Sequence, residues 1–241
     1  MSKYRIPARL NKKIGQAMHD YSMFEEGDKV LIAVSGGVDS LTLACVLKLW
    51  QQKMPFYFDI TAYHIDHGFW RRAAGSSDQG EEVAEQLRAN DIRCEVVAEK
   101  EIVEEDRTCF LCSRNRRSQL FDIAKERGFS KIALGHHKDD LIETFLLNAI
   151  YSGNISTMVP KQDLFGATLS IVRPLAYLEK TDVQGIAKSL QLNVVKNLCP
   201  LSDDTRREKV RSLLNRLYME EPGAKNSLFA SLSNVRNDYL L

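Results

Sequence analysis

The stretch KVLIAVSGGVDSLTLACVLKLW, residues 29–50, decides the fold of this chain. A short apolar run typical of a buried strand leads into Ser-Gly-Gly, and an apolar segment with helical spacing follows at once. The two glycines free the backbone to aim successive N–H groups inward, and the following helix offers its positive end. Ser35 and Ser40 add hydroxyl donors. The pattern therefore predicts a phosphate cradle at the end of a strand.

This cradle differs from the two common nucleotide loops. It lacks the lysine and the length of the G-x-x-x-x-G-K-S/T loop, and it does not have the spacing of G-x-G-x-x-G. The alternative without a ligand is a strand-to-helix turn whose glycines serve packing alone.

Segments typical of strands and of helices alternate beyond this turn. Candidate strands cover 30–34, 58–63, 94–98 and 131–134, and candidate helices cover 41–51, 78–90, 114–126 and 140–151. A further strand and helix are expected at 169–172 and 180–190, a helix at 205–218 and a short terminal helix at 226–237. This order predicts an α/β fold, a doubly wound, mostly parallel sheet with helices on both faces. We expect a helical lead-in at 1–28, the sheet domain at 29–200 and a C-terminal helical extension at 201–241.

Composition narrows the functional classes. The chain has 241 residues, with 33 Lys and Arg against 32 Asp and Glu, so its formal charge of +1 creates no global field for polyanions. Contacts with nucleic acid would need local basic patches. No apolar run approaches the roughly 20 residues that span a bilayer, and the polar start lacks the apolar segment of a secretory signal. We therefore expect a cytoplasmic protein without a membrane partner.

Two further polar stretches are expected at the same edge of the sheet as the cradle. HIDHG, residues 64–68, closes the second predicted strand, and GHHKDDLIET, residues 135–144, follows the fourth and opens a helix. Ligands of doubly wound sheets bind at this edge. As isolated residues, His64 and His67 could be ordinary core or surface histidines. Asp139 or Asp140 could simply cap the helix, with Glu143 in its first turn.

The cysteines indicate a metal site. An odd number of cysteines, five, in a reducing compartment argues against a disulfide framework. Cys109 and Cys112 form a C-x-x-C pair just before a predicted helix that carries Arg114, Arg116 and Arg117 in its first turn. Thiols beside guanidinium groups ionise readily and are then good metal ligands. A redox pair is the alternative, but it normally follows a strand directly, and the acidic segment 99–106 is poor strand material.

Cys199 is the natural third ligand. Three sulfurs could hold zinc together with a histidine, or a [4Fe–4S] cluster with one iron left open, and the number of thiolates does not choose between them. The ordinary alternative for Cys199 is a lone buried cysteine. Cys45, inside a predicted helix, and Cys94, at a strand start, are interpreted as core residues.

The motifs together resemble a known family. S-G-G-x-D-S after a strand resembles the pyrophosphate loop of the N-type ATP pyrophosphatases, which cleave ATP between the α and β phosphates. With C-x-x-C-S-R-x-R-R, G-H-H-x-D-D and a late N-L-C, the chain resembles the TtcA family of tRNA 2-thiocytidine synthetases over nearly its whole length. The similar segments include KKIGQAMHDYSMFEEGDKV, IVRPLAYLEKTDV and PGAKNSLFASLSNV.

The resemblance implies a fold, a reaction and a set of ligands. The expected fold is the PP-loop fold of the adenine nucleotide α-hydrolases, and the expected reaction is ATP-dependent tRNA thiolation. A base carbonyl, C2 of a cytidine, would be adenylated and its oxygen replaced by sulfur. The implied cofactors are ATP, Mg²⁺ and an oxygen-sensitive [4Fe–4S] cluster held by Cys109, Cys112 and Cys199. The implied partners are tRNA and sulfide, or a sulfur donor charged by a cysteine desulfurase.

Site residues follow from the same motifs. We expect catalytic roles for Asp39, which would help to hold magnesium, for Asp140 near the reacting base or its metal, and for Arg116. The expected nucleotide-binding residues are Ser35, Gly36, Gly37, Asp39, Ser40, His64, Asp66, Gly135 and His136. Candidates for RNA contacts are Arg71, Arg72, Arg114, Arg116, Arg117, Arg206, Arg207 and Arg211, with Phe69 or Trp70 stacking on a base. The arginines of 206–216 could equally be a solvated helix face.

Two departures from the family pattern leave alternatives open. Val38 stands where the family loop usually has lysine, and residues 64–68 differ from the more usual Asn-Leu-Asp-Gln. Both changes resemble the lysidine-synthetase branch, so one alternative is a tRNA base ligase that needs no metal. A second is a metal- and nucleotide-binding protein that completes no reaction. The apolar terminal segments 228–232 and 240–241 leave room for a homodimer.

Overall fold

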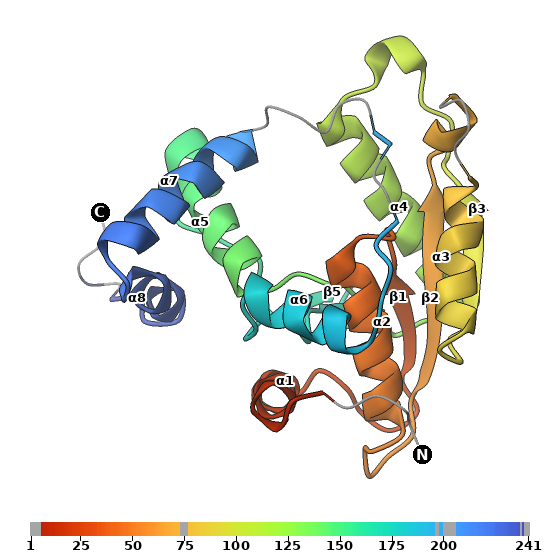
Figure 1. Cartoon of the computed structure of the whole chain (residues 1–241), viewed down its shortest axis with the longest axis horizontal. Helices are drawn as coiled ribbons and strands as arrows, with labels where there is room; N and C mark the ends of the chain where they lie inside the picture. Colours follow the sequence, from red (N-terminus) through yellow and green to blue (C-terminus); the bar gives the residue numbers. More distant parts are fainter. Residues whose placement is uncertain (1–5, 73–76, 196–197, 200–205, 237, 239–241) are drawn as a thin grey trace.

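The computed structural model describes residues 6–72, 77–195, 198–199, 206–236 and 238. Six strands form one sheet in the order β3-β2-β1-β4-β6-β5 (Figure 1). Parallel pairing joins β3 (Cys94–Ala98), β2 (Asp59–Asp66), β1 (Lys29–Ala33), β4 (Lys131–Ala133) and β6 (Leu169–Val172). In this register Ile32 pairs with Ala62 on one side and with Ala133 on the other. The predicted fold class is confirmed.

The central strand shows why the sheet is covered on both faces. Val30, Leu31 and Ile32 are all fully buried, as the continuous apolar run predicts. Side chains alternate between the faces of a strand. Val30 and Ile32 accordingly lie in the larger apolar core, whereas Leu31 lies in a second core.

Helices on each face close the two cores. The larger core receives apolar side chains from α1 (Ala8–Asp20), α2 (Val38–Gln51), α3 (Gln79–Arg88) and α6 (Lys180–Ser189). On the other face, α4 (Cys109–Arg127) contributes Leu120 and Ala124 to the second core. Because α1 supplies the buried Ile14 to the larger core, the lead-in packs with the sheet domain. The predicted domain boundaries at residues 28 and 200 stay a prediction.

A third group of helices stands beside the sheet. α5 (Lys138–Ser152), α7 (Arg206–Glu220) and α8 (Ala224–Ser231) share a small apolar cluster around Ile142, Val210 and Leu214. Figure 1 shows these helices together, away from β3 and α3. Leu228 and Phe229, from a segment considered for a homodimer, pack against this cluster, and residues 240–241 lie outside the described part. No helix of the described residues is long and apolar enough to cross a lipid bilayer.

The structure differs from the predicted elements at three places. The polar stretch before residue 166 contains an unpredicted edge strand, β5 (Lys161–Leu164), which runs antiparallel to β6. α4 begins at Cys109 rather than at residue 114, because the Thr108 hydroxyl caps it by accepting from the Leu111 N–H at 3.1 Å. The terminal helix is α8, shorter than the predicted 226–237, of which residue 237 is not described. Residue 205, the predicted start of the helix that contains α7, is also outside the described residues.

Candidate active site

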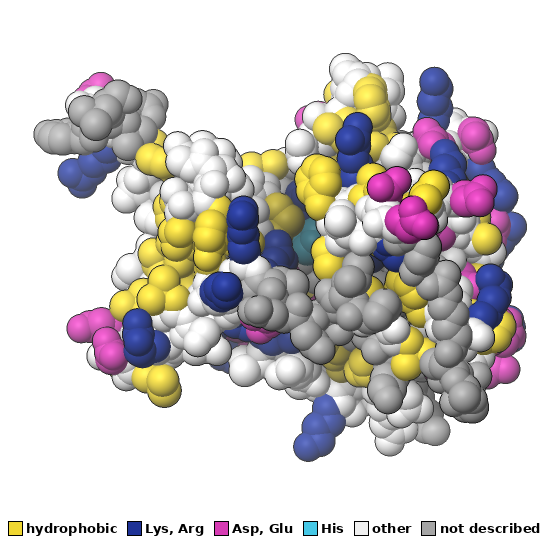
Figure 2. Space-filling view, turned by 90° about the horizontal axis from the view of Figure 1, so that it is seen from above, with side chains coloured by type: hydrophobic (Ala, Val, Ile, Leu, Met, Phe, Trp, Pro, Cys, Tyr) yellow, Lys and Arg dark blue, Asp and Glu magenta, His cyan; other side chains and the backbone are white. Residues whose placement is uncertain are grey.

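The carboxyl ends of β1, β2, β4 and β6 open into one cavity of about 1150 Å³. Figure 2 shows the molecule hollowed near its centre, with Lys and Arg side chains around the hollow. All but one of the predicted catalytic, nucleotide-binding and metal-binding residues line this cavity: Ser35, Gly37, Asp39, Ser40, His64, Asp66, Cys109, Cys112, Arg116, Gly135, His136, Asp140 and Cys199. Gly36 is buried behind the lining.

The loop from Ser35 to Ser40 has the geometry of an anion cradle. The Ser40 hydroxyl accepts from the Ser35 N–H at 3.1 Å and donates to the Gly37 carbonyl at 2.9 Å, which fixes the turn. Gly36 has a φ of +85°, and a Cβ there would lie 2.9 Å from a methyl carbon of Val83, so only glycine fits. No side chain caps α2 at Gly37, so the first N–H groups of the helix remain for a ligand.

A lysine from a distant segment stands beside this loop. Val38 provides no charge, but the Lys180 ammonium at the start of α6 lies 2.7 and 2.9 Å from the two carboxylate oxygens of Asp39. Sequence analysis missed Lys180 because it lies 141 positions from Asp39. Asp39, expected to help with magnesium, is therefore paired with a cation in this structure.

The segment after β4 both caps α5 and places acidic groups at the cavity. Asp140 accepts from the His137 N–H at 3.0 Å, so the capping role weighed for it from the sequence is confirmed. Its carboxylate also lies 3.4 Å from His137 Nε2 and 3.8 Å from Arg207.

Asp139 instead binds Lys225 at 2.8 Å and the Lys180 N–H at 2.8 Å. Burial alone would raise the pKa of Asp139, but hydrogen bonds from His137, Lys225 and the Lys180 N–H hold it well below its usual range. Asp139 thus ties α5 to α6 and α8.

Two histidines of the cavity, His64 and His136, are hydrogen-bonding groups whose pKa values are lowered. His64 is buried, and its Nδ1 lies 2.9 Å from the Val34 carbonyl oxygen. Burial lowers the pKa of His64. Burial and the charges of Arg173 and Arg207 lower the pKa of His136 to about 3. His136 Nδ1 accepts from Arg173 Nε at 3.2 Å, so the proton of the neutral ring is on Nε2.

The three predicted metal ligands share the cavity wall. Cys109 is exposed and Cys112 and Cys199 are half-buried. Cys112 and Cys199 are close enough to interact electrostatically. The prediction that neighbouring arginines make these thiols ionise readily is wrong for Cys112, because burial raises its pKa more than Arg107 lowers it. Among the described residues, no three His, Cys, Asp or Glu side chains are gathered closely enough to hold a metal ion. The donor set nevertheless fits an iron–sulfur cluster in kind, because three thiols line one cavity.

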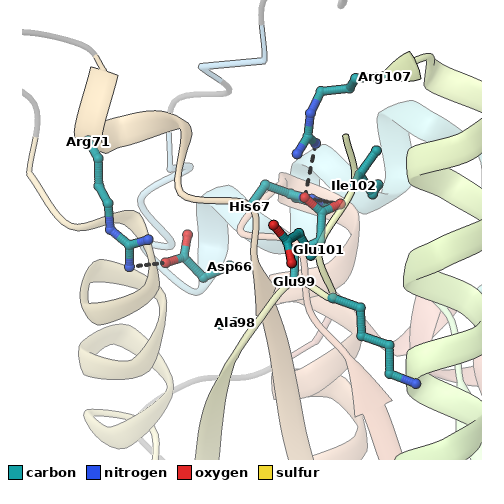
Figure 3. Close-up of a pocket in the computed structure, with 9 residues that line it drawn as sticks. Asp66, His67, Arg71, Ala98, Glu99, Glu101, Ile102 and Arg107 are labelled. Carbon is teal, nitrogen blue, oxygen red and sulfur yellow. Dashed lines mark hydrogen bonds and ion pairs between the residues drawn. The ribbon is translucent and has the colours of Figure 1, made fainter. Parts of the chain in front are cut away.

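A second cavity, of about 240 Å³, is lined by an ion pair between Arg107 and Glu99 (Figure 3). Arg107 donates to Glu99 at 2.9 Å and to the Cys112 sulfur at 3.3 Å. The Glu99 carboxylate also lies 2.7 Å from His67 Nδ1. These side-chain contacts run from His67 through Glu99 and Arg107 to Cys112. They therefore connect the end of β2 with the first turn of α4.

The candidate RNA-binding side chains are largely engaged within the protein. Trp70 donates to Asp66 at 3.3 Å, and Phe69 stacks on His67. Arg211 forms two hydrogen bonds to the buried Glu143, at 2.8 and 3.1 Å, which indicates a structural role. Of the candidate arginines, Arg71, Arg116 and Arg117 line one of the two cavities and Arg114 lines neither. The side chain of Arg72 is not described.

Comparisons with known proteins show the family of this chain. The PP-loop domain family matches residues 7–217. The tRNA-cytidine(32) 2-sulfurtransferase of Cupriavidus pinatubonensis is 34% identical, covering 98% of this chain and 77% of the relative. The enzyme of that name from Pseudomonas syringae pv. tomato is 36% identical, covering all of this chain and 88% of the relative.

Two solved structures share the fold. The U34-tRNA thiolase NcsA from Methanococcus maripaludis, solved with its [4Fe-4S] cluster, is 22% identical and has a TM-score of 0.77 over 94% of this chain and 78% of its own. The NAD⁺ synthetase from Burkholderia pseudomallei is 17% identical, with a TM-score of 0.54 over 98% of this chain and 92% of its own. Sequence and structure together place the chain in the PP-loop family, and within it the chain belongs to the tRNA-cytidine(32) 2-sulfurtransferases.

Proposed function

We propose that this protein is an ATP-dependent tRNA sulfurtransferase that replaces the C2 oxygen of a cytidine with sulfur. The single observation that carries the proposal is the shared cavity. It joins the Ser35–Ser40 loop, the acidic residues Asp39 and Asp140 and the three cysteines at one edge of the sheet. A ligase without a metal would have no use for three thiols there.

The first half of the reaction uses the loop and the acidic wall. The base carbonyl oxygen attacks the α-phosphorus of ATP, the bond to the bridging oxygen breaks, and the electron pair leaves with pyrophosphate. The N–H groups of the loop and the start of α2 stabilise the charge that develops on this leaving group. Asp39 and Asp140 are the proposed magnesium ligands, and His137 lies within 3.8 Å of both carboxylates.

The second half of the reaction uses the cysteine wall. Sulfur attacks the activated C2, and AMP departs with the former carbonyl oxygen, so no net oxidation occurs. Cys109, Cys112 and Cys199 are the proposed ligands of a [4Fe–4S] cluster, which would supply a site for sulfide on an iron without a protein ligand. Arg116 also lines this cavity and adds a positive charge there.

Sulfide, free or from a donor charged by a cysteine desulfurase, is the proposed sulfur source. A homodimer is the proposed assembly. Exposed apolar side chains outside the cavity, Ile150 at 53% and Met219 at 77%, support it.

Deletion of the gene tests the proposed acceptor. We expect 2-thiocytidine to disappear from tRNA and to return with the wild-type gene. The variant Asp140→Asn should restore about 100-fold less 2-thiocytidine than the wild-type gene. Its side chain keeps an oxygen that can cap α5, but it loses the negative charge. Asp122→Asn, an exposed α4 residue paired with Lys100, is the matched control and should restore fully. Mass analysis of tRNA nucleosides checks each strain, and 2-thiocytidine that persists after deletion would contradict the proposal.

Removal of Arg107 should lower the affinity of the protein for the cluster and leave ATP binding unchanged. An N–H···S bond to a ligand stabilises a reduced cluster, and losing such a partner typically costs about 10- to 100-fold in metal affinity. Arg107→Met is made together with Glu99→Gln, so that no unpaired carboxylate is left buried. We expect lower iron and sulfide content and a lower reduction potential, measured by chemical analysis and by a redox titration. Arg71→Met, which removes another cation from the same small cavity, is the control. Wild-type iron content and potential in the double variant would refute the role of Arg107.

A further inference from the structure

Arg173 is a buried cation held by neutral acceptors. It directly follows β6, and its side chain is 4% exposed. Its guanidinium donates to His136 Nδ1 and to the Val159 carbonyl, both neutral acceptors. No carboxylate of the described residues lies within ion-pair distance of it. Burying a charge in this way is costly unless an anion compensates it.

Other positive charges surround the same point. Arg173 lines the large cavity together with Arg116 and Arg117 of α4. The charges of Arg173, Arg207 and Arg116 all act on His136, and that of Arg117 acts on Arg173. The neutral His136 adds an N–H donor at Nε2. Asp140, whose carboxylate lies 3.8 Å from Arg207, is shared with His137 at 3.4 Å. The wall around His136 therefore has an excess of positive charge.

The strand order places Arg173 after a strand that does not pair with the strand of the phosphate loop. The loop follows β1, whereas Arg173 follows β6, and β4 lies between these two strands. His64 and Asp66, the residues expected at the adenosine, end β2 on the opposite side of β1. Arg173 thus stands on the side of the loop that is left for the acceptor.

We propose that Arg173, together with Arg116, Arg117 and the N–H of His136, forms a second phosphate-binding subsite, distinct from the Ser35–Ser40 loop. The ligand is a phosphate oxyanion, because Arg173 presents a planar fork that matches two phosphate oxygens. In the proposed function two groups have this chemistry: a backbone phosphate of the RNA beside the acceptor base, and the α-phosphate that remains on the activated base. The subsite holds this phosphate while the sulfur replaces the oxygen.

The test compares the binding of two probes to the full-length protein, purified anaerobically with its iron–sulfur cluster. One probe is a labelled anticodon stem-loop RNA, and the other is AMP, which carries only the α-phosphate. Arg173→Gln keeps donors for His136 and Val159 but removes the charge. It should weaken one of the two probes about 10-fold or more, the scale of a lost charge-assisted hydrogen bond. Arg88→Gln removes an exposed arginine of α3 that does not line the cavity, and both probes should bind it as they bind the wild type.

The pattern of losses identifies the phosphate. Weaker RNA binding assigns the subsite to the RNA backbone if the slope of log binding constant against log salt concentration also falls by about one. Weaker AMP binding assigns it to the α-phosphate. Binding of both probes within about twofold of the wild type overturns the proposal.

A second variant separates charge from structure. Arg173→Lys keeps the positive charge and should retain most of the affinity. If Arg173→Lys loses as much affinity as Arg173→Gln, the contacts with Val159 and His136 cause the loss rather than the charge, and the proposal is overturned. Thermal unfolding without ligand shows that each variant is folded. The AMP arm does not depend on which nucleoside is modified, so failure of the proposed acceptor leaves this test intact.

Discussion

Gly135→Ala is expected to abolish ATP binding and to destabilise the fold. A Cβ at this position would lie 2.9 Å from the carbonyl carbon and oxygen of Asp39 and 3.1 Å from the Ser40 nitrogen. These are backbone atoms of the phosphate loop, so no side chain can rotate away. The loop after β4 would have to move off the start of α2, and such overpacking typically costs about 1–3 kcal/mol of folding free energy. The same displacement would spoil the cradle.

A matched glycine makes this result specific. Gly185 lies in α6, and a Cβ there meets no atom within 4 Å. Gly185→Ala should leave ATP binding unchanged and stabilise the protein by about 0.5–1 kcal/mol, because alanine is the better helix former. Calorimetric titration with ATP and thermal unfolding measure both variants. ATP binding by Gly135→Ala with wild-type affinity would show that the two loops are not in the predicted contact.

Cys199→Ala should eliminate tRNA thiolation and leave ATP binding intact. Cys199 is 87 positions from Cys112, yet both line the large cavity, and the proposed cluster needs all three thiolates. Removing one ligand should therefore remove the iron. The Ser35–Ser40 loop is held by hydrogen bonds of its own Ser40 hydroxyl, so the nucleotide site should persist.

The control for this variant is another cysteine of the same chain. Cys94 starts β3 outside the cavity lining, and burial raises its pKa to about 11, so it is a neutral thiol at physiological pH. Cys94→Ala should keep its iron. Iron and acid-labile sulfide are measured after anaerobic purification, and 2-thiocytidine is measured in the complemented strain. A Cys199→Ala protein with the wild-type iron content, or a wild-type protein that carries zinc, would contradict the cluster.

The local sequence pattern predicted five of the six strands of the sheet and missed the edge strand β5. β1 and β6 were predictable because buried strands of a parallel sheet are continuous apolar runs, as KVLIA and LSIV show. β5 has the sequence KQDL with two exposed positions, and it is a strand only because β6 offers a free edge. The start of α4 was misplaced because the Thr108 cap is a single hydroxyl, a weaker signal than the arginines that follow.

The candidate site divides in the same way. Ser35 to Ser40 and the Gly135 to Asp140 segment were predictable because each is contiguous and follows a strand at the ligand edge of the sheet. Lys180, Arg107 and Arg173 were not assigned any role. Each is an ordinary basic residue in the sequence, and each takes its role from a partner that other elements bring to it: Asp39, Cys112 and His136.

The sequence by itself determined the order of strands and helices, the glycine turn and the identity of the three thiols, because backbone freedom and donor chemistry belong to the residues themselves. Only the tertiary structure decided which charges are paired. It neutralises Asp39 with Lys180, buries Glu143 against Arg211 and brings no carboxylate of the described residues to Arg173. The physical reason is that the energy of a charge depends on its distance to other charges and on its burial, and both are set only when segments far apart in the chain pack together.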